Sequence, residues 1–466
     1  MVKTDGESIT KVLTEIITGL GLDSANCVGY CFDGAANMCG KNKGVANRLK
    51  TVCPLALYVH CYGHRLNLAI QSSLKNVKPL KNALGVIQCL YNFIEASPKR
   101  HAVFCETDVD NGRDGSFVRT LKSQGVTRWA CHWEAVKAVY DELKRIVDCL
   151  LSLSEDSDPK TSHEAKSLII AVSDFDFLIG LCILKVILLN THSLNKYLQG
   201  KNVDVRSAYN NAKASISVLE KCRSEDNFNL VWQQANVLAE EVTSILRDTD
   251  FEFKAAHLPR TKPSKRVQAL SGEVTGEGDR IDNIQQHYKI NCFYVAFDSV
   301  LFEMNNRFND GDQSVLTGLS SIIFDAIPSN ECFDTISQIY GLDKDLLRVD
   351  YNILQHFKSG LSNVNSASDL YGQLFSSGIL EMMPEMQKVL RIFASIPATS
   401  CSAERSFSTL RRIKTYTRNR IGQDRLSNIA ILNIERTYAN NVLREDLDEV
   451  VDTFARKSSN RIRLFF

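Results

Sequence analysis

The sequence lacks an uninterrupted apolar stretch of the roughly 18 residues that a membrane-spanning helix needs. The closest candidate, 175–189, is short and is interrupted by Gly180 and Lys185, which is typical of a buried helix in a folded protein. Residues 1–7 are polar and contain no apolar core of a signal peptide, which argues against secretion. The sequence therefore predicts a chain that has no membrane partner.

An excess of one charge is also lacking, and so is any C-x-x-C pair. The 466 residues include 55 Lys and Arg against 54 Asp and Glu, so the net charge of +1 gives no whole-chain argument for nucleic acid. The lack of C-x-x-C argues against a zinc ribbon or a thioredoxin-like redox site. The 14 cysteines, with no signal peptide, favour free thiols in a reducing compartment. Hydrophobic residues at 44% and charged residues at 23% exclude a disordered or collagen-like chain.

The N-terminal region alternates between helical and strand patterns. Helical spacing over 7–21 is followed by a strand pattern at 27–33 and a helix at 44–49. A second buried strand is predicted at 55–61, with a helix following at 64–74. This alternation predicts parallel pairing of the two strands in an α/β layer.

From about residue 127 to 391 the pattern is almost entirely helical. Helical periodicity covers 133–153, 165–197, 208–222, 230–247 and 284–308. Between the last two lies 258–282, which is rich in Pro, Gly, Lys and Glu and reads as a flexible linker or exposed loop. Its basic first half is better explained by solvent exposure than by DNA binding or a localisation signal.

The last hundred residues again predict short helices. Helices are expected at 386–395, 400–414 and 424–435, with Asp424 as the N-cap of the last. No internal repeat is present.

Asp33 is the first candidate for chemistry, because it follows a predicted strand and precedes a Gly34 turn. The carboxyl ends of parallel strands are where ligands and catalytic groups gather. The alternative is a turn residue that caps the next segment. One carboxylate alone also cannot hold the paired divalent ions that nuclease chemistry uses.

Two further candidates lie at Cys61 and at Trp129. Cys61 and His64 have C-x-x-H spacing after the second strand, but four-coordinate zinc needs a second pair, which is not nearby. A structural or site-lining role for His64 is therefore favoured. Arg128 and Trp129 precede a long helix, where packing of the indole is the default interpretation.

The segment 400–413 carries a stronger signal. Phe407, Leu410 and Ile413 fall on one helical row, which Glu404 continues, and we expect this row to face inward. A carboxylate on an inward row is costly unless it is paired or bound to metal. Residues 401–436 include eight basic and three acidic side chains, which is compatible with phosphate contacts or with a solvated helical face.

Four of these segments occur in an order typical of one family. The segments 32–38, 58–68, 127–129 and 402–408 together resemble the hAT superfamily of DNA transposases, in particular its zinc finger MYM-type 1-like subgroup. The resemblance runs from the first residues to about Tyr438. Four motifs in this order indicate the family more specifically than any one motif does.

The resemblance implies a fold class of α/β plus mostly α, with an incomplete RNase H-like fold interrupted by a long all-helical insertion domain. It implies a partial RNase H-like region at 1–130 and the insertion at 131–370. A hAT C-terminal dimerisation region at 371–440 would complete the RNase H-like fold, and 441–466 would form a tail. The implied partner is a second copy, in a homodimer or higher oligomer, with DNA as a further possible partner and no small-molecule substrate.

The resemblance also assigns roles to residues. Active members bind divalent metal, Mg or Mn, with an Asp-Asp-Glu set that cleaves and transfers DNA strands. Asp33 matches the second Asp and Glu404 the final Glu. Six residues would contact DNA: His64, Arg128, Trp129, Arg405, Arg411 and Arg412. Five would support dimerisation: Phe407, Leu410, Ile413, Ile429 and Leu432.

One departure from the family pattern limits the functional expectation. The family's first Asp lies on an early strand, whereas Asp5 and Asp23 follow no strand-like pattern here. We therefore expect a transposase-derived protein that is catalytically incomplete, needs no cofactor, and retains dimerisation and DNA contact. The alternatives are an active transposase or nuclease whose first strands and zinc finger are missing from this sequence version, which would bind metal, and a co-opted protein-interaction module. Nuclear localisation follows from the resemblance alone.

Overall fold

The structure is a computed structural model that separates into two compact units. It describes residues 3–40, 42–106, 120–122, 130–200, 203–258, 284–308, 314–358, 360, 361, 364, 366–415, 418 and 420–457. The first unit is Met1–Thr399 and the second is Ser400–Phe466. The predicted boundary at 371 therefore lies inside the first unit, because the helices up to 395 pack with the preceding ones.

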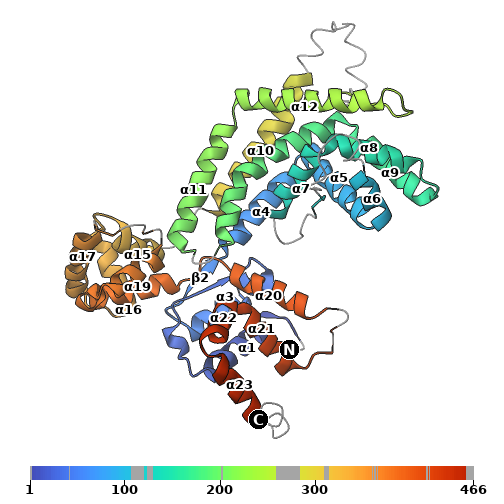
Figure 1. The fold of residues 1–466 in the computed structure, drawn as a ribbon. Helices are drawn as coiled ribbons and strands as arrows, with labels where there is room; N and C mark the ends of the chain where they lie inside the picture. The colour runs from blue at the N-terminus through green and yellow to red at the C-terminus, as the bar shows by residue number, and fades with distance from the viewer. Residues whose placement is uncertain are drawn as a thin grey trace. The chain divides into compact units, whose positions relative to one another are not determined.

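The N-terminal part of the first unit contains a small parallel sheet (Figure 1). Strand β1 (Gly29–Phe32) pairs with β2 (Leu57–His60) in parallel, with Gly29 opposite Leu57 and Phe32 opposite His60. The accompanying helices are α1 (Gly6–Gly19), η1 (Ser24–Asn26), α2 (Ala36–Cys39) and α3 (Val45–Val52). Both predicted strands and their parallel pairing are confirmed.

One face of this sheet is aromatic. Tyr30, Phe32 and Tyr58 lie on it, with ring centroids 5.5–6.4 Å apart. They pack against Val45 and Leu49 of α3, and the Tyr30 hydroxyl donates a hydrogen bond of 2.8 Å to the Ala46 carbonyl. This contact holds α3 on the sheet and satisfies the only polar group of the Tyr30 side chain.

A helical region follows the sheet. Its elements are α4 (Tyr62–Lys75), α5 (Lys78–Glu95), α6 (Pro98–Glu106), α7 (Ala130–Asp141), α8 (Leu143–Ser154), α9 (Pro159–Val172), α10 (Phe175–Leu198), α11 (Val205–Cys222), α12 (Glu225–Leu246), the π-helical η2 (Lys289–Tyr294) and α14 (Val295–Arg307). Figure 1 shows α10 between the helices that contact it, which include α5, α7, α11 and α12. The long helical insertion predicted from periodicity is confirmed as helical.

Helix α10 is the one described helix that is long and apolar enough to cross a membrane. In its most apolar window, 67% of the residues are buried inside the protein. It is therefore the central helix of a folded core, as the interruption by Gly180 and Lys185 predicts.

Two stretches predicted as single helices are each divided. The predicted 133–153 helix breaks at Glu142, between α7 and α8. The predicted 165–197 helix breaks at Ser173 and Asp174, where the Asp174 side chain accepts a hydrogen bond from the Asp176 N–H and caps α10. Periodicity alone missed these breaks because the apolar spacing continues across them.

Five further helices are described in the rest of the first unit. They are α15 (Ser314–Phe324), α16 (Asn330–Tyr340), α17 (Lys344–Lys358), α18 (Ala367–Ser376) and α19 (Pro384–Ser395), with the 3-10 turn η3 (Ile379–Met382) before α19. The Asp350 carboxylate on α17 is fully buried and caps α19, because its Oδ2 accepts hydrogen bonds from the N–H groups of Glu385 and Met386 at 2.8 and 3.0 Å. The predicted helix at 386–395 is confirmed.

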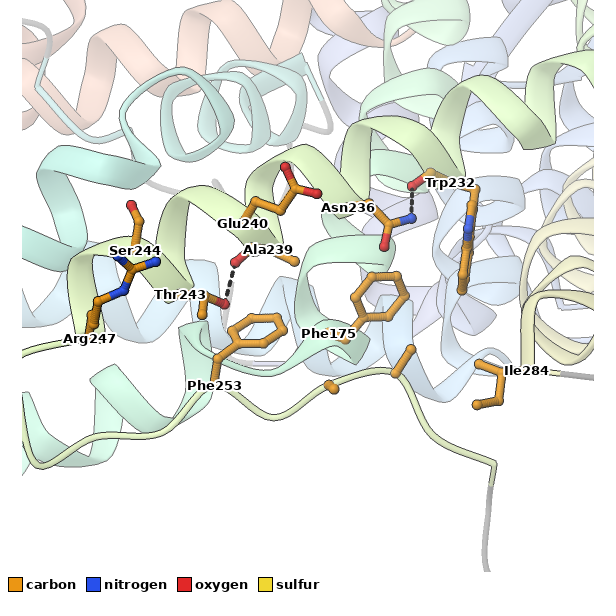
Figure 2. Close-up of a pocket in the computed structure, with 12 residues that line it drawn as sticks. Phe175, Trp232, Asn236, Ala239, Glu240, Thr243, Ser244, Arg247, Phe253 and Ile284 are labelled. Atoms are coloured by element: carbon orange, nitrogen blue, oxygen red, sulfur yellow. Dashed lines mark hydrogen bonds between the residues drawn. The ribbon is translucent and has the colours of Figure 1, made fainter. Parts of the chain in front are cut away.

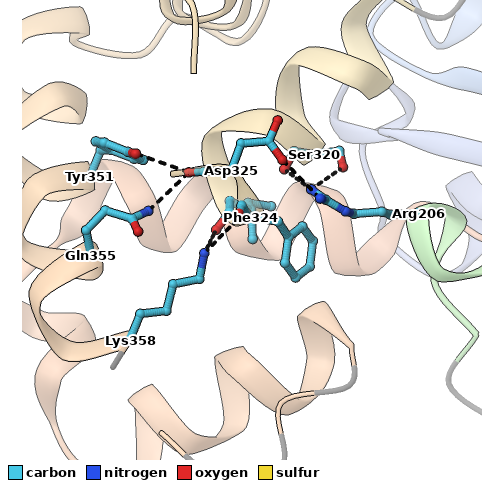
Figure 3. A network of polar contacts seen from close by, with 8 residues as sticks. Arg206, Ser320, Phe324, Asp325, Tyr351, Gln355 and Lys358 are labelled. Carbon is cyan, nitrogen blue, oxygen red and sulfur yellow. Dashed lines mark hydrogen bonds and ion pairs between the residues drawn. The ribbon is translucent and has the colours of Figure 1, made fainter. Parts of the chain in front are cut away.

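The C-terminal end of α15 is held by cations from two other helices (Figure 3). Arg206 on α11 donates to the Ser320 carbonyl at 3.1 Å and to the Asp325 carboxylate at 2.9 Å. Lys358 on α17 donates to the carbonyls of Ile323 and Phe324 at 2.7 and 3.2 Å. These contacts satisfy the last carbonyls of α15 and join it to α11 and α17.

The described part of the second unit has four helices: α20 (Cys401–Ile413), α21 (Gln423–Ile434), α22 (Arg436–Glu445) and α23 (Leu447–Arg456). The segment expected as a tail from 441 is therefore helical to Arg456. The predicted N-cap at Asp424 is wrong, because Gly422 caps α21 and Asp424 lies in its first turn.

The described residues are thus mostly helical, with one two-stranded parallel sheet. This agrees with the predicted class of α/β plus mostly α, while the RNase H-like identity of the sheet region stays a prediction. Nearly all of the predicted linker at 258–282 lies outside the described residues.

Candidate functional site

Asp33 and His60 stand at the carboxyl ends of the two paired strands. Asp33 directly follows β1, and His60 is the last residue of β2, in register with Phe32. The Asp33 side chain is exposed, and its Oδ1 accepts a hydrogen bond of 3.2 Å from the Ala35 N–H. Asp33 therefore acts as a turn residue, which was one of the two interpretations of the sequence. Its carboxylate is also accessible to solvent.

The turn after Asp33 lies directly against the His60 ring. A Cβ atom at Gly34 would lie 2.9 Å from both Cε1 and Nε2 of His60, and 3.7 Å from Cδ2 of His64. A real Cβ does not approach other atoms so closely. Glycine at position 34 is thus what allows the chain to pass over the imidazole.

His60 is held neutral at pH 7. Burial, followed by the nearby positive charges of Arg65 and His64, lowers the pKa of His60 from 6.5 to about 4. Its Nε2 is buried and has no hydrogen-bond partner among the described residues. The sequence interpretation did not select His60, although its place at the end of a strand pattern beside Cys61 offered a signal.

Cys61 and His64, predicted as a C-x-x-H pair, occupy different environments. Cys61 is fully buried, and its N–H donates a hydrogen bond of 2.9 Å to the Phe32 carbonyl. His64 is half-buried on α4, with its ring centroid 5.7 Å from that of His60. His64 therefore lies at the same end of the sheet as Asp33.

The end of α19 returns the chain to this sheet. The Tyr62 N–H donates a hydrogen bond of 3.1 Å to the Ala398 carbonyl. On β1, a Cβ at Gly29 would lie 3.3 Å from the Cα of Ile396. Residues 396–398 therefore pack beside the strands, after the whole helical region has intervened in the sequence.

Arg65 joins the start of α4 to the end of α14. It is buried, and its guanidinium donates a hydrogen bond of 3.1 Å to the Arg307 carbonyl. The same guanidinium lies 4.8 Å from the centroid of the Tyr62 ring, which in turn packs 5.7 Å from that of Phe308. These contacts fix the end of α14 to the start of α4, directly after β2.

Among its described residues, the first unit holds no cluster of potential metal ligands. Mg²⁺ takes oxygen ligands in near-octahedral geometry. Among the described residues of the first unit, no three His, Cys, Asp or Glu side chains bring their ligand atoms together. Asp33 lies in this unit and Glu404 in the second, so the predicted metal pair is divided between the two units.

Helix α20 carries the remaining candidates of the segment 400–413. Its buried residues are Cys401 and Thr409, whereas Phe407 is 67% exposed. The prediction that the row of Phe407 faces inward is wrong for the single chain. Leu410 and Ile413 of the same row are half-buried, so the row is covered only in part in the single chain.

The predicted dimerisation residues differ in exposure. Leu410, Ile413 and Ile429 are half-buried, and Phe407 and Leu432 are 67% and 61% exposed. Further exposed apolar side chains of the same unit are Ile431, Ile434, Tyr438, Leu443, Leu447, Val450 and Phe454. So many exposed apolar groups in one small unit are typical of an interaction surface.

The predicted DNA-contacting residues fall into three groups. Arg411 and Arg412 are exposed on α20, and Arg405 is half-buried there. His64 lies beside the sheet, as described above. Arg128 and Trp129 lie outside the described residues.

A separate apolar groove lies between α12 and the segment 253–256 (Figure 2). Its volume is about 490 Å³, and Phe175, Trp232 and Phe253 form its aromatic wall. The Phe175 and Trp232 rings pack edge to face at 5.1 Å, and Asn236 donates to the Trp232 carbonyl. The side chains of Asn236, Thr243 and Ser244 donate to backbone carbonyls of α12 itself, so these polar groups are engaged within the helix.

Comparison with known proteins agrees with the motif-based resemblance. Residues 381–438 match the hAT family C-terminal dimerisation region. Over 97% of its length, the chain is 24% identical to the 52 kDa repressor of the inhibitor of the protein kinase from Homo sapiens and 25% identical to the protein of that name from Mus musculus. The chain spans 58% of the length of each of these relatives. Residues 381–438 thus resemble the C-terminal dimerisation region of hAT proteins, and the chain as a whole is similar to these two relatives.

Proposed function

We propose that this chain is a transposase-derived protein whose C-terminal unit joins two copies of the chain. The observation that carries the proposal is the exposed apolar surface of α20 and α21, within the segment that matches the dimerisation region. Removing one Phe or Leu side chain from water is worth about 1.5–3 kcal/mol. Several such side chains, covered together, supply the driving force for stable self-association.

The proposal is tested by placing a charge on this surface. Phe407→Asp and Leu432→Asp should each convert the dimer into monomer in sedimentation experiments at micromolar concentration, because a buried unpaired carboxylate is costly. Phe302→Asp is the matched control, since Phe302 on α14 is 65% exposed in the first unit. A dimer that persists unchanged in both C-terminal variants would disprove the assignment.

We further propose that the sheet region has an RNase H-like origin and that the chain on its own does not cleave DNA. Asp33 and Glu404 correspond to two of the three carboxylates that the family resemblance implies, and two-metal cleavage needs the full set. Divalent metal would then bind weakly, and Asp33→Ala or Glu404→Ala would have little effect on any activity of the chain. Mn²⁺-dependent cleavage of a DNA end by wild type, lost in Asp33→Ala, would instead favour the active-transposase alternative.

DNA contact is a second candidate function, supported by the basic character of α20 and of the turn that follows it. Residues 401–436 carry eight basic and three acidic side chains, including the exposed Arg411 and Arg412. Phosphate contacts weaken steeply with salt. Binding to duplex DNA that is insensitive to salt, or no binding at all, would remove this candidate.

The proposal also covers the location of the chain and the alternative of a role without DNA. Nuclear localisation would follow from a DNA-associated role and is tested by imaging of the tagged chain. The alternative of a protein-interaction module without DNA contact would be supported by self-association in the absence of any DNA affinity.

A further inference from the structure

The match to the dimerisation region ends at residue 438, but the exposed apolar surface continues beyond it. On α23, Leu447 is 49% exposed and Val450 is 41% exposed. They are three residues apart and therefore lie on one side of the helix. Leu443 of α22, 53% exposed, precedes them. This second surface lies in a part of the chain to which the family match assigns no role.

Acidic side chains run along the edge of this surface. Asp446 and Glu449 each directly precede an apolar residue of the surface, so they form a parallel row beside it. Both are exposed. The stretch 445–452 contains five acidic residues and no basic one. The surface is thus apolar at its centre and negative at its edge.

A face of the opposite charge is present on α20. Phe407, Arg411 and Lys414 are spaced at i, i+4 and i+7, which places them on one row, and all three are exposed. Among the described residues, neither cation of this row forms an ion pair, and neither does Asp446 or Glu449. Arg411 and Lys414 are three residues apart, with Lys414 at the C-cap of α20, and Asp446 and Glu449 are also three residues apart, with Asp446 at the N-cap of α23.

We propose that α23 of one copy packs on α20 of a second copy, with Leu447 and Val450 against Phe407. Asp446 and Glu449 then pair with Arg411 and Lys414 across the contact. In a two-fold dimer the same contact occurs twice, because each copy offers both faces. This inference rests on the proposed self-association and names the surfaces that form it. It assigns Arg411 to a protein contact and leaves Arg412, Arg418 and Arg420 available for phosphate.

The test is a charge exchange in the full chain. The double variant Asp446→Lys with Glu449→Lys places cations against cations, and Arg411→Glu with Lys414→Glu places anions against anions. Each double variant should raise the dimer dissociation constant at least about tenfold, since like charges at a contact are strongly unfavourable. A mixture of the two should form heterodimers of nearly wild-type affinity, because both contacts are then complementary.

Two comparisons keep the inference separate from the proposed function. Glu240→Lys with Glu241→Lys on α12 makes the same change in net charge as Asp446→Lys with Glu449→Lys. Both glutamates are exposed, and this control should leave the dissociation constant unchanged. Mutual rescue in the mixture also excludes misfolding as the cause of weakening, because misfolded chains would not restore one another. Sedimentation equilibrium measures the dissociation constants of the wild type, the three double variants and the mixture at one salt concentration.

The outcomes are distinct. If Phe407→Asp abolishes the dimer but the charge variants do not weaken it, the α20–α23 pairing is wrong and the proposed dimer stands. Weakening without rescue in the mixture also overturns the pairing. Loss of DNA affinity in Arg411→Glu with Lys414→Glu, with an unchanged dimer, assigns that row to DNA instead. A wild-type chain that stays monomeric at all concentrations overturns both proposals.

Discussion

The backbone N–H of Tyr62 donates a hydrogen bond of 3.1 Å to the carbonyl of Ala398, a residue that the whole helical region separates from it in the sequence. This contact brings the end of α19 beside the carboxyl end of β2. It follows that the residues around Asp33 and His60 are positioned by both ends of the first unit. The packing of these long-range elements, more than any local pattern, therefore defines the candidate site.

Gly34→Ala should destabilise the first unit, because the new Cβ would lie 2.9 Å from the His60 ring. Overpacking of this kind costs about 1–3 kcal/mol. Urea unfolding measures the loss as a lower midpoint. Gly85→Ala is the control: Gly85 lies inside α5 with open space around it, so alanine there should stabilise by about 0.5–1 kcal/mol. Equal stability of the two variants would contradict the contact with His60.

The stability of the fold should fall between pH 6.5 and pH 4 because of His60. Its pKa is lowered to about 4 in the folded chain, so in this range the unfolded chain binds a proton that the folded chain does not. The contribution is fully present above pH 6.5 and is lost as the pH falls towards 4. His60→Gln should make the dependence of the unfolding free energy on pH shallower. His163→Gln, at an exposed position on α9, should leave it unchanged.

Arg206→Ala should loosen α15 from α11. The side chain donates to the Ser320 carbonyl and pairs with Asp325, and its guanidinium lies 4.7 Å from the Phe324 ring centroid. We expect a loss of about 1–2 kcal/mol in unfolding free energy and faster hydrogen exchange at the end of α15. Asp325→Asn should cost less, about 0–1 kcal/mol, because that ion pair is partly exposed. A larger effect for Asp325→Asn would reverse this ranking of the contacts.

Asp350→Ala should be among the most destabilising single changes in the first unit. The carboxylate is fully buried and accepts hydrogen bonds from two N–H groups at the start of α19. Removing it leaves those donors unsatisfied, at a cost of about 2–4 kcal/mol. Asp345→Ala on the same helix, at an exposed position, should change the midpoint of thermal unfolding little.

The sequence by itself determined the local elements and the family resemblance. The two strands, their parallel pairing and the helical character of the long central region follow from periodicity, because apolar spacing directly encodes which face of an element is buried. The order of the four motifs was enough to indicate the hAT family, which the match at 381–438 supports.

The tertiary structure decided what periodicity does not encode. The breaks at Glu142 and Asp174 depend on where helices pack and are capped, and the apolar spacing continues through both. The neutral state of His60 depends on its burial, to which the turn at Gly34, packed against its ring, contributes from another part of the sequence. An apolar row predicts a covered face but not what covers it, so only the structure shows that Phe407 stays exposed in the single chain. Burial is a property of the assembled fold, because it depends on which segments meet in space.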